Sequence, residues 1–580
     1  MTRKIFLGVV AAGLCAALAA PVGAAKSPAC APLDGVYIHD EDHKTVSWVG
    51  GRAAPGITIV SASGNRIVFS VANGFRLDSI CVSAGGKAHT KYNIDTVLPK
   101  SGPATVTITK AGRGIEQISF DTVKVPVCPT VEAPDVSFDE PLFIDRQRAG
   151  GEPVSIVGQD GSISVSAHAG TTHIYKNPTA APGAGDFAQG YFNQTLNWRS
   201  VDGGRTWDYI GQFGTEMGPH SITSTGFSDP DFAMDQGGNI YNVEIDLAND
   251  AVFMSPDDGQ SYPIAHPVAA SGDRPWLTAL EANEVFLYVN LPRTMWQSEN
   301  GGISWAPVLS PPVTAKSHPD PLDPDNAMIG PVGTGRFAIG VENENATPQT
   351  VTWTTKNFGP HSDVNENFFD TIALDRAGNV YQATAGGYSS ANDVTPNGDV
   401  SFMYYERATG DVNPSVIDIP TPPGDALWPW VIAGDDGRAV VVWYQNLAGK
   451  PNEFYIYAAY THNAHGTTVT CTDGSTRYIP PQFTVENASG RPFAIGKICL
   501  NGTNCNASLD FEGGDRRLGD FFTVNFDHEG NIFITSADTT LKNPIGGPKP
   551  VGNPIFIRQN GGDPILAQPD QVRPSRCLFP

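Results

Sequence analysis

Three short stretches of the chain repeat one pattern, and this repeat constrains the fold more than any other feature of the sequence. Each stretch reads Ser-x-Asp/Asn-x-Gly-x-Ser/Thr-aromatic, and the copies occupy residues 200–207, 255–262 and 298–305. Asp or Asn can hydrogen-bond to its own downstream backbone, and Gly supplies a backbone angle that other residues avoid. The pattern therefore predicts a tight hairpin turn that recurs along the chain, and a fold built from copies of one supersecondary unit.

These residues resemble the Asp-box, or BNR repeat, of the sialidase-like β-propellers. The resemblance implies a propeller fold. It also implies structural roles for Asp202, Asp257 and Asn300, because the Asp-box of that family lies at a turn far from the active site. A weaker fourth copy at residues 355–359 lacks the closing aromatic residue. A fold seldom fixes an activity, so function must be argued from other residues.

The N-terminus has the composition of a secretory signal. Lys4 precedes an apolar run over residues 5–20, and small residues lead to a cleavage point after Ala24 or Ala25. The run is short and Ala-rich for a membrane-spanning helix. We therefore expect residues 1–25 to be removed and the mature protein to be secreted, periplasmic or at the cell surface. We expect no transmembrane segment and a monomer.

Composition favours an all-β protein and excludes one class of partner. Gly (62) and Pro (47) are abundant, whereas only 17% of residues are charged, which is typical of a turn-rich β fold. The net charge of −23 argues against nucleic acid, because phosphate backbones bind basic surfaces.

Seven cysteines follow the predicted cleavage point, and export permits disulfides. We expect Cys499 to pair with Cys505, which is close in sequence. Cys30 and Cys128 bracket the N-terminal region and are candidates to pair, with Cys81 as a competitor. The odd number leaves one thiol without an intramolecular partner, and no spacing fits a zinc site.

The region before the Asp-box repeats differs from the rest of the chain. Short β-type runs alternate with Gly, Pro and Asn over residues 26–130, which predicts an Ig-like β-sandwich. We interpret residues 131–140 as a linker, residues 141–570 as the propeller and residues 571–580 as a C-terminal tail. The sandwich contains no recognisable chemistry and is predicted to be an accessory module.

A second repeat within the propeller region predicts the number of blades. Its unit is an apolar strand, an Asp/Gly turn and another apolar strand, found at residues 152–165, 231–241, 274–280, 327–332, 369–381, 430–442 and 521–533. These units would supply the inner strands of seven blades, with the Asp-box hairpins further out. Six blades, as in the sialidases, is the alternative if one copy is false.

The innermost strands of a propeller converge on its axis, so the residues just before them should meet in one pocket. We predict catalytic residues Glu152, Asp231, Arg274, Arg517 and Asp520. Predicted substrate-binding residues are Asp229, Asn367, Trp276, Trp428 and Trp430, and the same positions in other blades include Asp273, Asp325, Asn326 and Asp370. Paired carboxylates can act as acid and base, arginines bind carboxylates as forks, and indoles can stack on sugar rings. The alternative is structural, because Asp and Asn before a strand often cap turns.

The resemblance implies a sialidase-like glycoside hydrolase acting on an acidic or complex glycan. That family uses three arginines on the substrate carboxylate, a Tyr–Glu pair and an Asp acid. The Arg-Ile-Pro motif of the family is absent, Arg148 is the candidate third arginine, and Tyr444 ends an apolar strand as core aromatics do.

Two other functions remain open. A polysaccharide lyase could use a histidine base, for which His168, His173 and His220 are candidates. A non-catalytic propeller could instead bind glycan or protein at the cell surface. We expect no cofactor and no metal ligands. A ring of axial carboxylates could hold Ca²⁺, but the chain has no contiguous calcium loop, phosphate-binding loop, Gly-x-Ser-x-Gly or HExxH motif.

Overall fold

The computed structural model shows an all-β protein, and no helix occurs among the residues it describes. Those residues are 35–39, 46–48, 54–63, 66–83, 89–93, 104–109, 117–168, 174–175, 186–187, 195–212, 229–245, 250–268, 272–308, 311–343, 350–361, 368–386, 399–500, 514–542, 549 and 551–570. The predicted signal segment and C-terminal tail lie outside them. The chain divides into one unit of residues 1–130 with 469–477, and a second unit of residues 131–468 with 478–580.

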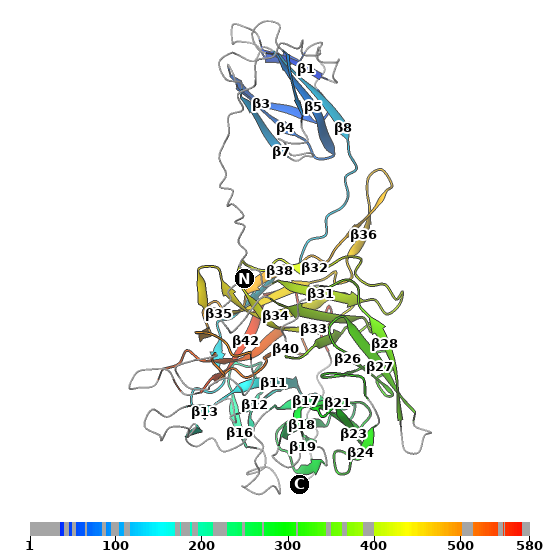
Figure 1. Cartoon of the computed structure of the whole chain (residues 1–580), viewed down its shortest axis with the longest axis vertical. Helices are drawn as coiled ribbons and strands as arrows, with labels where there is room; N and C mark the ends of the chain where they lie inside the picture. The colour runs from blue at the N-terminus through cyan, green and yellow to red at the C-terminus, as the bar shows by residue number, and fades with distance from the viewer. Residues whose placement is uncertain are drawn as a thin grey trace, which may run out of the picture. The chain divides into compact units, whose positions relative to one another are not determined.

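The first unit contains the predicted β-sandwich (Figure 1). One sheet has the strand order β2-β1-β8-β5-β6 and the other β3-β4-β7. Their bounds are β1 Gly35–His39, β2 Val46–Trp48, β3 Ile57–Ser63, β4 Arg66–Val71, β5 Phe75–Ser83, β6 His89–Asn93, β7 Ala104–Thr109 and β8 Gln117–Lys124. Alternate residues of β4 are buried, as expected for a strand with one face on a core, and Phe69 packs edge-on against Phe120.

A disulfide within this unit joins two segments that are distant in sequence. Cys128 pairs with Cys471, which lies between β36 (Thr467–Thr470) and β37 (Thr476–Ile479). The Thr472 backbone N–H donates to the Val127 carbonyl at 2.9 Å. The expected pairing of Cys128 with Cys30 or Cys81 is therefore wrong, because a partner 343 residues away was invisible to local spacing. Cys499 is disulfide-bonded, whereas Cys505 lies outside the described residues.

The second unit is a seven-bladed β-propeller, which confirms the predicted fold and blade count. Each blade is an antiparallel sheet whose strands run outward from the axis in chain order. Blade 1 consists of β11 Gly151–Val157, β12 Ile163–His168, β15 Thr195–Ser200 and β16 Asp208–Gln212. Blade 2 consists of β17 Asp231–Met234, β18 Ile240–Ile245, β19 Asp250–Ser255 and β20 Ile264–Val268. Blade 3 consists of β21 Asp273–Ala279, β22 Val285–Leu291, β23 Thr294–Ser298 and β24 Ala306–Val308. The short hairpin of β13 (Ile174–Tyr175) and β14 (Asp186–Phe187) lies between β12 and β15 in sequence.

The other four blades follow the same plan. Blade 4 consists of β25 His318–Pro319, β26 Ala327–Pro331, β27 Arg336–Asn343 and β28 Thr350–Asn357, and blade 5 of β29 Thr371–Leu374, β30 Val380–Ala385, β31 Val400–Tyr405 and β32 Ile417–Ile419. Blade 6 consists of β33 Ala426–Ala433, β34 Ala439–Leu447, β35 Lys450–Thr461 and β38 Thr484–Asn487, with β39 Ala494–Ile495 also paired to β35. Blade 7 consists of β40 Thr523–Phe526, β41 Ile532–Asp538 and β42 Asn553–Gly562.

Strands from the start of the propeller region close the ring. β10 (Leu142–Phe143) pairs with β42, with Leu142 opposite Phe556, and so becomes the outer strand of blade 7. β9 (Val136–Phe138), which lies in the segment interpreted from the sequence as a linker, also pairs with β42. Radial repetition leaves each blade with one outer edge strand, which ranges from two residues in β10 to eight in β28.

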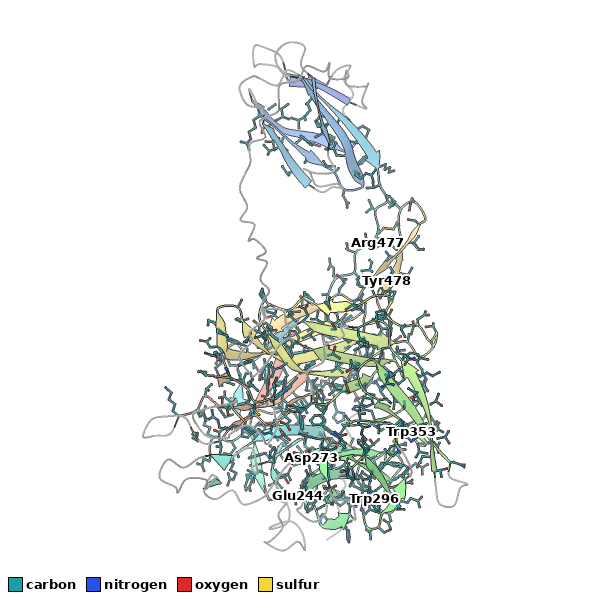
Figure 2. The ribbon with its side chains drawn as sticks, viewed as in Figure 1. Glu244, Asp273, Trp296, Trp353, Arg477 and Tyr478 are labelled. Carbon is teal, nitrogen blue, oxygen red and sulfur yellow. A yellow bond between two sulfur atoms is a disulfide. The ribbon has the colours of Figure 1, made fainter. Side chains whose placement is uncertain are left out.

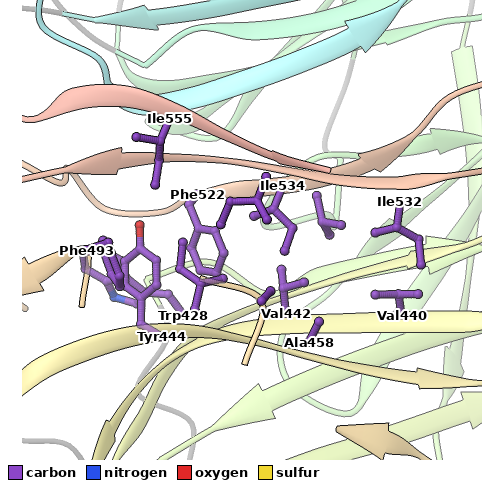
Figure 3. Close-up of a cluster of buried hydrophobic side chains, with 14 of the residues drawn as sticks. Trp428, Val440, Val442, Tyr444, Ala458, Phe493, Phe522, Ile532, Ile534 and Ile555 are labelled. Atoms are coloured by element: carbon purple, nitrogen blue, oxygen red, sulfur yellow. The ribbon is translucent and has the colours of Figure 1, made fainter. Parts of the chain in front are cut away.

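Alternate residues of each blade face the next blade, and most of these seams are apolar. Between blades 6 and 7, a cluster of aliphatic and aromatic side chains is buried, including Trp428, Val440, Val442, Tyr444, Phe522, Ile532 and Ile534 (Figure 3). Tyr444 stacks on Phe522 with ring centroids 4.1 Å apart. Burial of each such side chain stabilises the fold by roughly 1.5–3 kcal/mol. Most of the stability of the ring therefore lies in these seams.

Two sequence assignments were wrong in detail, both in blade 4. The predicted inner-strand copy at residues 327–332 is the second strand, β26, because the inner strand β25 has only two residues and carries no apolar run. The weak Asp-box copy at residues 355–359 lies at the end of the outer strand β28, not between third and fourth strands.

Candidate functional site

Strand direction assigns the two faces of the propeller different roles. The innermost strands all begin at one face, here named the entry face, which also carries the connections from second to third strands. The hairpin turns between first and second strands and between third and fourth strands lie at the opposite face. Residues preceding the innermost strands can therefore meet near the axis at the entry face, as the sequence predicted.

Each of the three Asp-box motifs forms the same type of hydrogen-bonded turn at the opposite face. In each, the first Ser hydroxyl donates to the Asp or Asn side chain at 2.8–3.0 Å and accepts the Gly backbone N–H at 2.9 Å. Asp202, Asp257 and Asn300 each accept the backbone N–H four residues later at 2.9 Å. These contacts are all local, and the turns connect the third and fourth strands of blades 1, 2 and 3.

A strained backbone marks the strand entries of four blades. Among the described residues, seven non-glycine residues have positive φ, and four of them precede a proline at an inner-strand entry: Glu152 (49°), Asp229 (59°), Arg274 (64°) and Trp428 (53°). Such conformations cost on the order of 1–3 kcal/mol each and cluster at functional sites. The register shifts beside Glu152 and Trp428, as in a β-bulge, which re-aims side chains.

The strained residues of blades 1, 2 and 3 form one buried charge cluster with blade 7. The Arg274 guanidinium contacts Glu152 at 2.9 Å, Asp520 at 3.0 Å and Asp229 at 3.6 Å. Arg516 pairs with Asp520 and lies 3.8 Å from Glu152. Glu152 is fully buried, Arg274 is 2% exposed and Asp229 is 4% exposed. We name these residues, with His168, the axial charge cluster.

Blade 7 reaches the cluster through a glycine. Gly519 has φ +82°, and a Cβ at this position would lie 2.0 Å from the Cγ of Glu152. The absence of a side chain lets the Asp520 backbone N–H donate to Glu152 Oε1 at 2.8 Å. Gly519 therefore brings blade 7 against blade 1 at the axis.

The cluster pushes two neighbouring carboxyl pKa values apart. Burial opposes ionisation of Glu152, but the charges of Arg274, His168 and Arg516 outweigh it and hold its pKa well below the usual range. Burial raises the pKa of Asp229 well above its usual value; Arg274 opposes this shift, and Glu152 adds to it. These shifts favour the ionised form of Glu152 and the protonated form of Asp229, a division typical of carboxyl pairs with different roles.

Four aromatic side chains, here named the axial aromatic cluster, pack beside these charges. Trp430 stacks on Phe521, and Trp276 contacts both Phe369 and Phe521 at centroid distances of 5.6–5.7 Å. The Arg274 guanidinium lies 4.2 Å from the Phe369 ring centroid and 4.8 Å from that of Phe521. These cation–π contacts stabilise the buried arginine.

An axial cavity of about 260 Å³ extends along the inner strands. Trp430 lines it, and so do Asp231, Lys316 and His318. Lys316 Nζ contacts the two Asp231 oxygens at 2.7 and 2.8 Å, and the Leu277 backbone N–H also donates to Asp231. Burial raises the pKa of Asp231 although Lys316 opposes it, and burial lowers the pKa of His318 to about 3. By contrast, the hollow between Phe368, Trp428 and Asp520 measures about 10 Å³.

The structure brings together some predicted residues and separates others. Glu152, Asp229, Arg274 and Asp520 meet in the axial charge cluster, whereas Asp231 belongs to the cavity. Arg517 instead forms a bidentate pair with Asp515. Trp276 and Trp430 belong to the axial aromatic cluster, Trp428 packs on Tyr444, and Asn367 lies outside the described residues.

Several secondary candidates have local roles. Arg148 pairs with Asp145, and the Tyr444 hydroxyl lies 2.7 Å from Ser536 Oγ in the seam between blades 6 and 7. Asp325 and Asn326 lie between β25 and β26, at the face opposite the entry face, because the blade 4 repeat was assigned one strand too late. Asp273 is exposed beside the axial charge cluster, and Figure 2 labels it. His173 and His220 lie outside the described residues.

Sequence reasoning missed Arg516 and Lys316. Arg516 is adjacent to the predicted Arg517, and only the turn geometry decides which guanidinium faces the axis. The sequence does carry one shared pattern at these positions, because a proline follows the residue at the entry of four inner strands, as Glu-Pro, Asp-Pro, Arg-Pro and Trp-Pro. A residue before proline is normally extended, so the left-handed conformation could not be expected from the dipeptide.

The axial charge cluster fits a metal ion poorly. Ligand atoms of Glu152, His168 and Asp229 lie within 4.8 Å of one another, and a second such group is Asp375, Asp436 and His465. In the first group, however, the Arg274 guanidinium already contacts both carboxylates. A cation there would be repelled by Arg274 and Arg516. In the second group, His465 Nε2 lies 2.5 Å from the Tyr381 hydroxyl. The part of the chain that the structure describes contains no helix able to cross a membrane.

Comparisons with known proteins do not assign this chain to a family. No family model and no curated protein matches it. It is similar to the NanB sialidase of Streptococcus pneumoniae, at 11% identity over 90% of this chain and 88% of that one, with a TM-score of 0.31. The α-L-arabinanase of Penicillium chrysogenum matches at 10% identity over 74% and 98% (TM-score 0.31), and YCF48 from Cyanidioschyzon merolae at 11% over 72% and 98% (TM-score 0.35). Identities and TM-scores this low do not support any assignment of activity or fold. The fold assignment rests on the strand pairing described above.

Proposed function

We propose that this protein is an exported, sialidase-like glycoside hydrolase that acts on an acidic or complex glycan at the entry face. The observation that carries the proposal is the set of strained residues at the strand entries of blades 1, 2 and 3. Glu152, Asp229 and Arg274 come from three blades, and all three lie in one cluster. Strain that recurs at one point of a fold indicates a site that the surrounding structure is built to hold.

Glycoside hydrolysis needs one carboxyl that donates a proton, and the raised pKa of Asp229 favours the protonated form that such a donor requires. In the proposed reaction, protonated Asp229 gives its proton to the leaving-group oxygen as the glycosidic bond breaks. Water adds its hydroxide to the anomeric carbon and gives its proton to a second carboxyl group, for which Asp520, with a side chain 12% exposed, is more accessible than the fully buried Glu152. Arg274 and Arg516 hold these carboxylates in place.

The test is a screen of the mature protein on sialosides, neutral oligosaccharides and acidic polysaccharides, with reducing ends as the readout. Asp229→Asn should lower turnover by about 10²–10⁴-fold, the usual contribution of a general acid. Asp257→Asn is the matched control, because it makes the same change in an Asp-box turn at the opposite face. Equal loss of activity in both variants, each shown to be folded, would remove Asp229 from the reaction. Unsaturated uronate appearing together with the new reducing ends would identify a lyase.

The second candidate is a non-catalytic propeller that binds glycan or protein. It is favoured by the burial of the axial charge cluster, where each guanidinium is already paired with a carboxylate. Under this alternative the substrate panel shows binding, for example in a glycan array, without turnover. Export is part of both proposals and is supported by the disulfide between Cys128 and Cys471, since disulfides persist in oxidising compartments. N-terminal sequencing of the mature protein tests cleavage after Ala24 or Ala25.

A further inference from the structure

The seam between blades 1 and 2 is lined by polar side chains along its second and third strands. Thr195 Oγ1 of blade 1 donates to Glu244 Oε2 of blade 2 at 2.8 Å, so β15 faces β18 across this seam. Figure 2 labels Glu244. Residues two apart on a strand share a face, so Asn197 of β15 and Asn242 of β18 also point into the seam. Ser166 of β12 is the register partner of Asn197 and lies on the same side.

Three side chains at the middle of this seam have no hydrogen-bond partner in the described part of the chain. They are Ser166, Asn197 and Asn242, all at most 2% exposed. The unpartnered atoms are Ser166 Oγ and both the Nδ2 and Oδ1 of each asparagine. A buried polar group left unpaired costs about 1–3 kcal/mol, so five such atoms in one seam require an explanation.

The chemistry of these atoms identifies what fills the seam. Each carboxamide offers a donor and an acceptor, and Ser166 offers both in one hydroxyl. A cation would bind the oxygens and leave both amide groups unpaired, whereas water can both donate and accept. Since a buried water makes about three hydrogen bonds, the five atoms call for about two waters.

We propose that the seam between blades 1 and 2 is an internal hydration site of about two ordered waters held by Ser166, Asn197 and Asn242. The site adjoins the axial charge cluster. His168 follows Ser166 on the same face of β12, about 7 Å along the strand, a spacing that one water bridges between side chains. His168 Nε2 lies 3.4 Å from Glu152 Oε2. The waters therefore give the buried Glu152–His168 pair a route for proton exchange.

Water-proton magnetic relaxation dispersion and a high-resolution crystal structure test the proposal on the unaltered protein. We expect long-lived internal water in solution and, in the crystal, water density within hydrogen-bonding distance of Asn197 and Asn242. The double variant Asn197→Leu/Asn242→Leu should lose this water, and the imidazole N–H of His168 should exchange more slowly in NMR spectra. Asn446→Leu is the matched control, because Asn446 is equally buried but bonds to Asp425 within the protein. It should destabilise the fold and leave the seam water unchanged.

Two results would overturn the proposal. One is a dry seam in the crystal structure, with the two carboxamides bonded to each other. The other is a stoichiometric cation found by elemental analysis, whose removal by EDTA lowers Tm. Both measurements use the unaltered protein, so they hold even if the leucine variants fail to fold. Neither depends on turnover, so the outcome is separate from that of the proposed function.

Discussion

Two seams of the same ring solve the same packing problem with different chemistry. Between blades 6 and 7 the facing positions carry Val440, Val442, Phe522, Ile532 and Ile534, and the seam is apolar (Figure 3). Between blades 1 and 2 the corresponding second and third strands carry Ser, His, Thr, Asn and Glu. Because blades share one architecture, the fold does not require polarity at this place. The polar seam also leads inward to the axial charge cluster.

The contrast indicates that different blades contribute stability and charged groups. The apolar seams supply most of the stability, because hydrophobic burial is the dominant favourable contribution to folding. Blades 1, 2, 3 and 7 supply the charged groups at the entry face, with the strained backbone that holds three of them. Substitutions in the two regions should therefore change the free energy of unfolding by different amounts, with different signs and with different pH dependence.

The largest effect is expected in the apolar seam. Phe522→Ala removes a fully buried ring that stacks on Tyr444, and should reduce the free energy of unfolding by about 3–5 kcal/mol. Urea unfolding followed by tryptophan fluorescence measures it. Ile303→Ala is the control, because Ile303 is 53% exposed and should change stability by less than about 0.5 kcal/mol. Similar losses from both changes would contradict the assignment of stability to the seam.

The next effect distinguishes Glu152 from Asp229 in the axial charge cluster, because their substitutions should change stability with opposite pH dependence. Glu152 has a lowered pKa, so its stabilisation is present above the unfolded pKa and is lost as pH falls through the folded pKa. Glu152→Gln should cost about 3 kcal/mol near neutral pH, because it leaves Arg274 with one fewer buried partner. The deficit should shrink in acid.

Asp229→Asn should behave oppositely. The raised pKa of Asp229 means that its burial destabilises the fold increasingly as pH rises above the unfolded pKa. The variant should therefore gain stability relative to the unaltered protein as pH rises from about 4 towards neutral. Urea titrations of both variants at several pH values give the comparison. Parallel pH profiles for the two variants would show that the pKa values are not divided as described.

The sequence predicted the ring better than the site, and particular residues show why. Repeats of strand, turn and strand are local patterns, so six of the seven inner-strand copies were correctly located, and the seventh failed where β25 has only two residues. The contacts of Arg274 depend instead on the left-handed backbone at Arg274 and on Gly519 in blade 7, both tertiary features. The same holds for the pairing of Cys128 with Cys471.

The polar seam was equally beyond sequence reasoning. Ser166, Asn197 and Asn242 lie in three separate strands, and each by itself is an ordinary polar residue of a β-strand. Only the register of β12 with β15, and the contact of Thr195 with Glu244, show that all three face one another across the seam. Alternation along a strand indicates which residues share a face, but not which blade that face meets.

A smaller effect is expected from emptying the seam of polar groups. Asn197→Leu/Asn242→Leu replaces both carboxamides by apolar groups of similar size, which is nearly neutral when it leaves few polar groups unpaired. We expect a change in unfolding free energy of less than about 2 kcal/mol, well below that of Phe522→Ala. Urea unfolding of the double variant beside Phe522→Ala measures the difference. A loss as large as that of Phe522→Ala would make the polar seam as important for stability as the apolar one.

The smallest effect is expected in the Asp-box turns, where the protein itself carries Asp in two copies and Asn in the third. Asn300 occupies the position of Asp202, and its Nδ2 donates to Ser304 Oγ at 2.8 Å, whereas Asp202 accepts from the Thr206 hydroxyl at 2.6 Å. Asp202→Asn should therefore cost less than about 1 kcal/mol at neutral pH, as for an exposed charge. Burial opposes ionisation, but hydrogen bonds from Thr206, Ser200 and Arg205 together outweigh it and lower the pKa of Asp202 to about 2. The stabilisation from this carboxylate is present above the unfolded pKa and disappears as pH falls towards about 2. Thermal unfolding of both proteins between neutral pH and acid should show the small gap in Tm closing, and a gap that widens in acid would mean that the turn does not hold the ionised form.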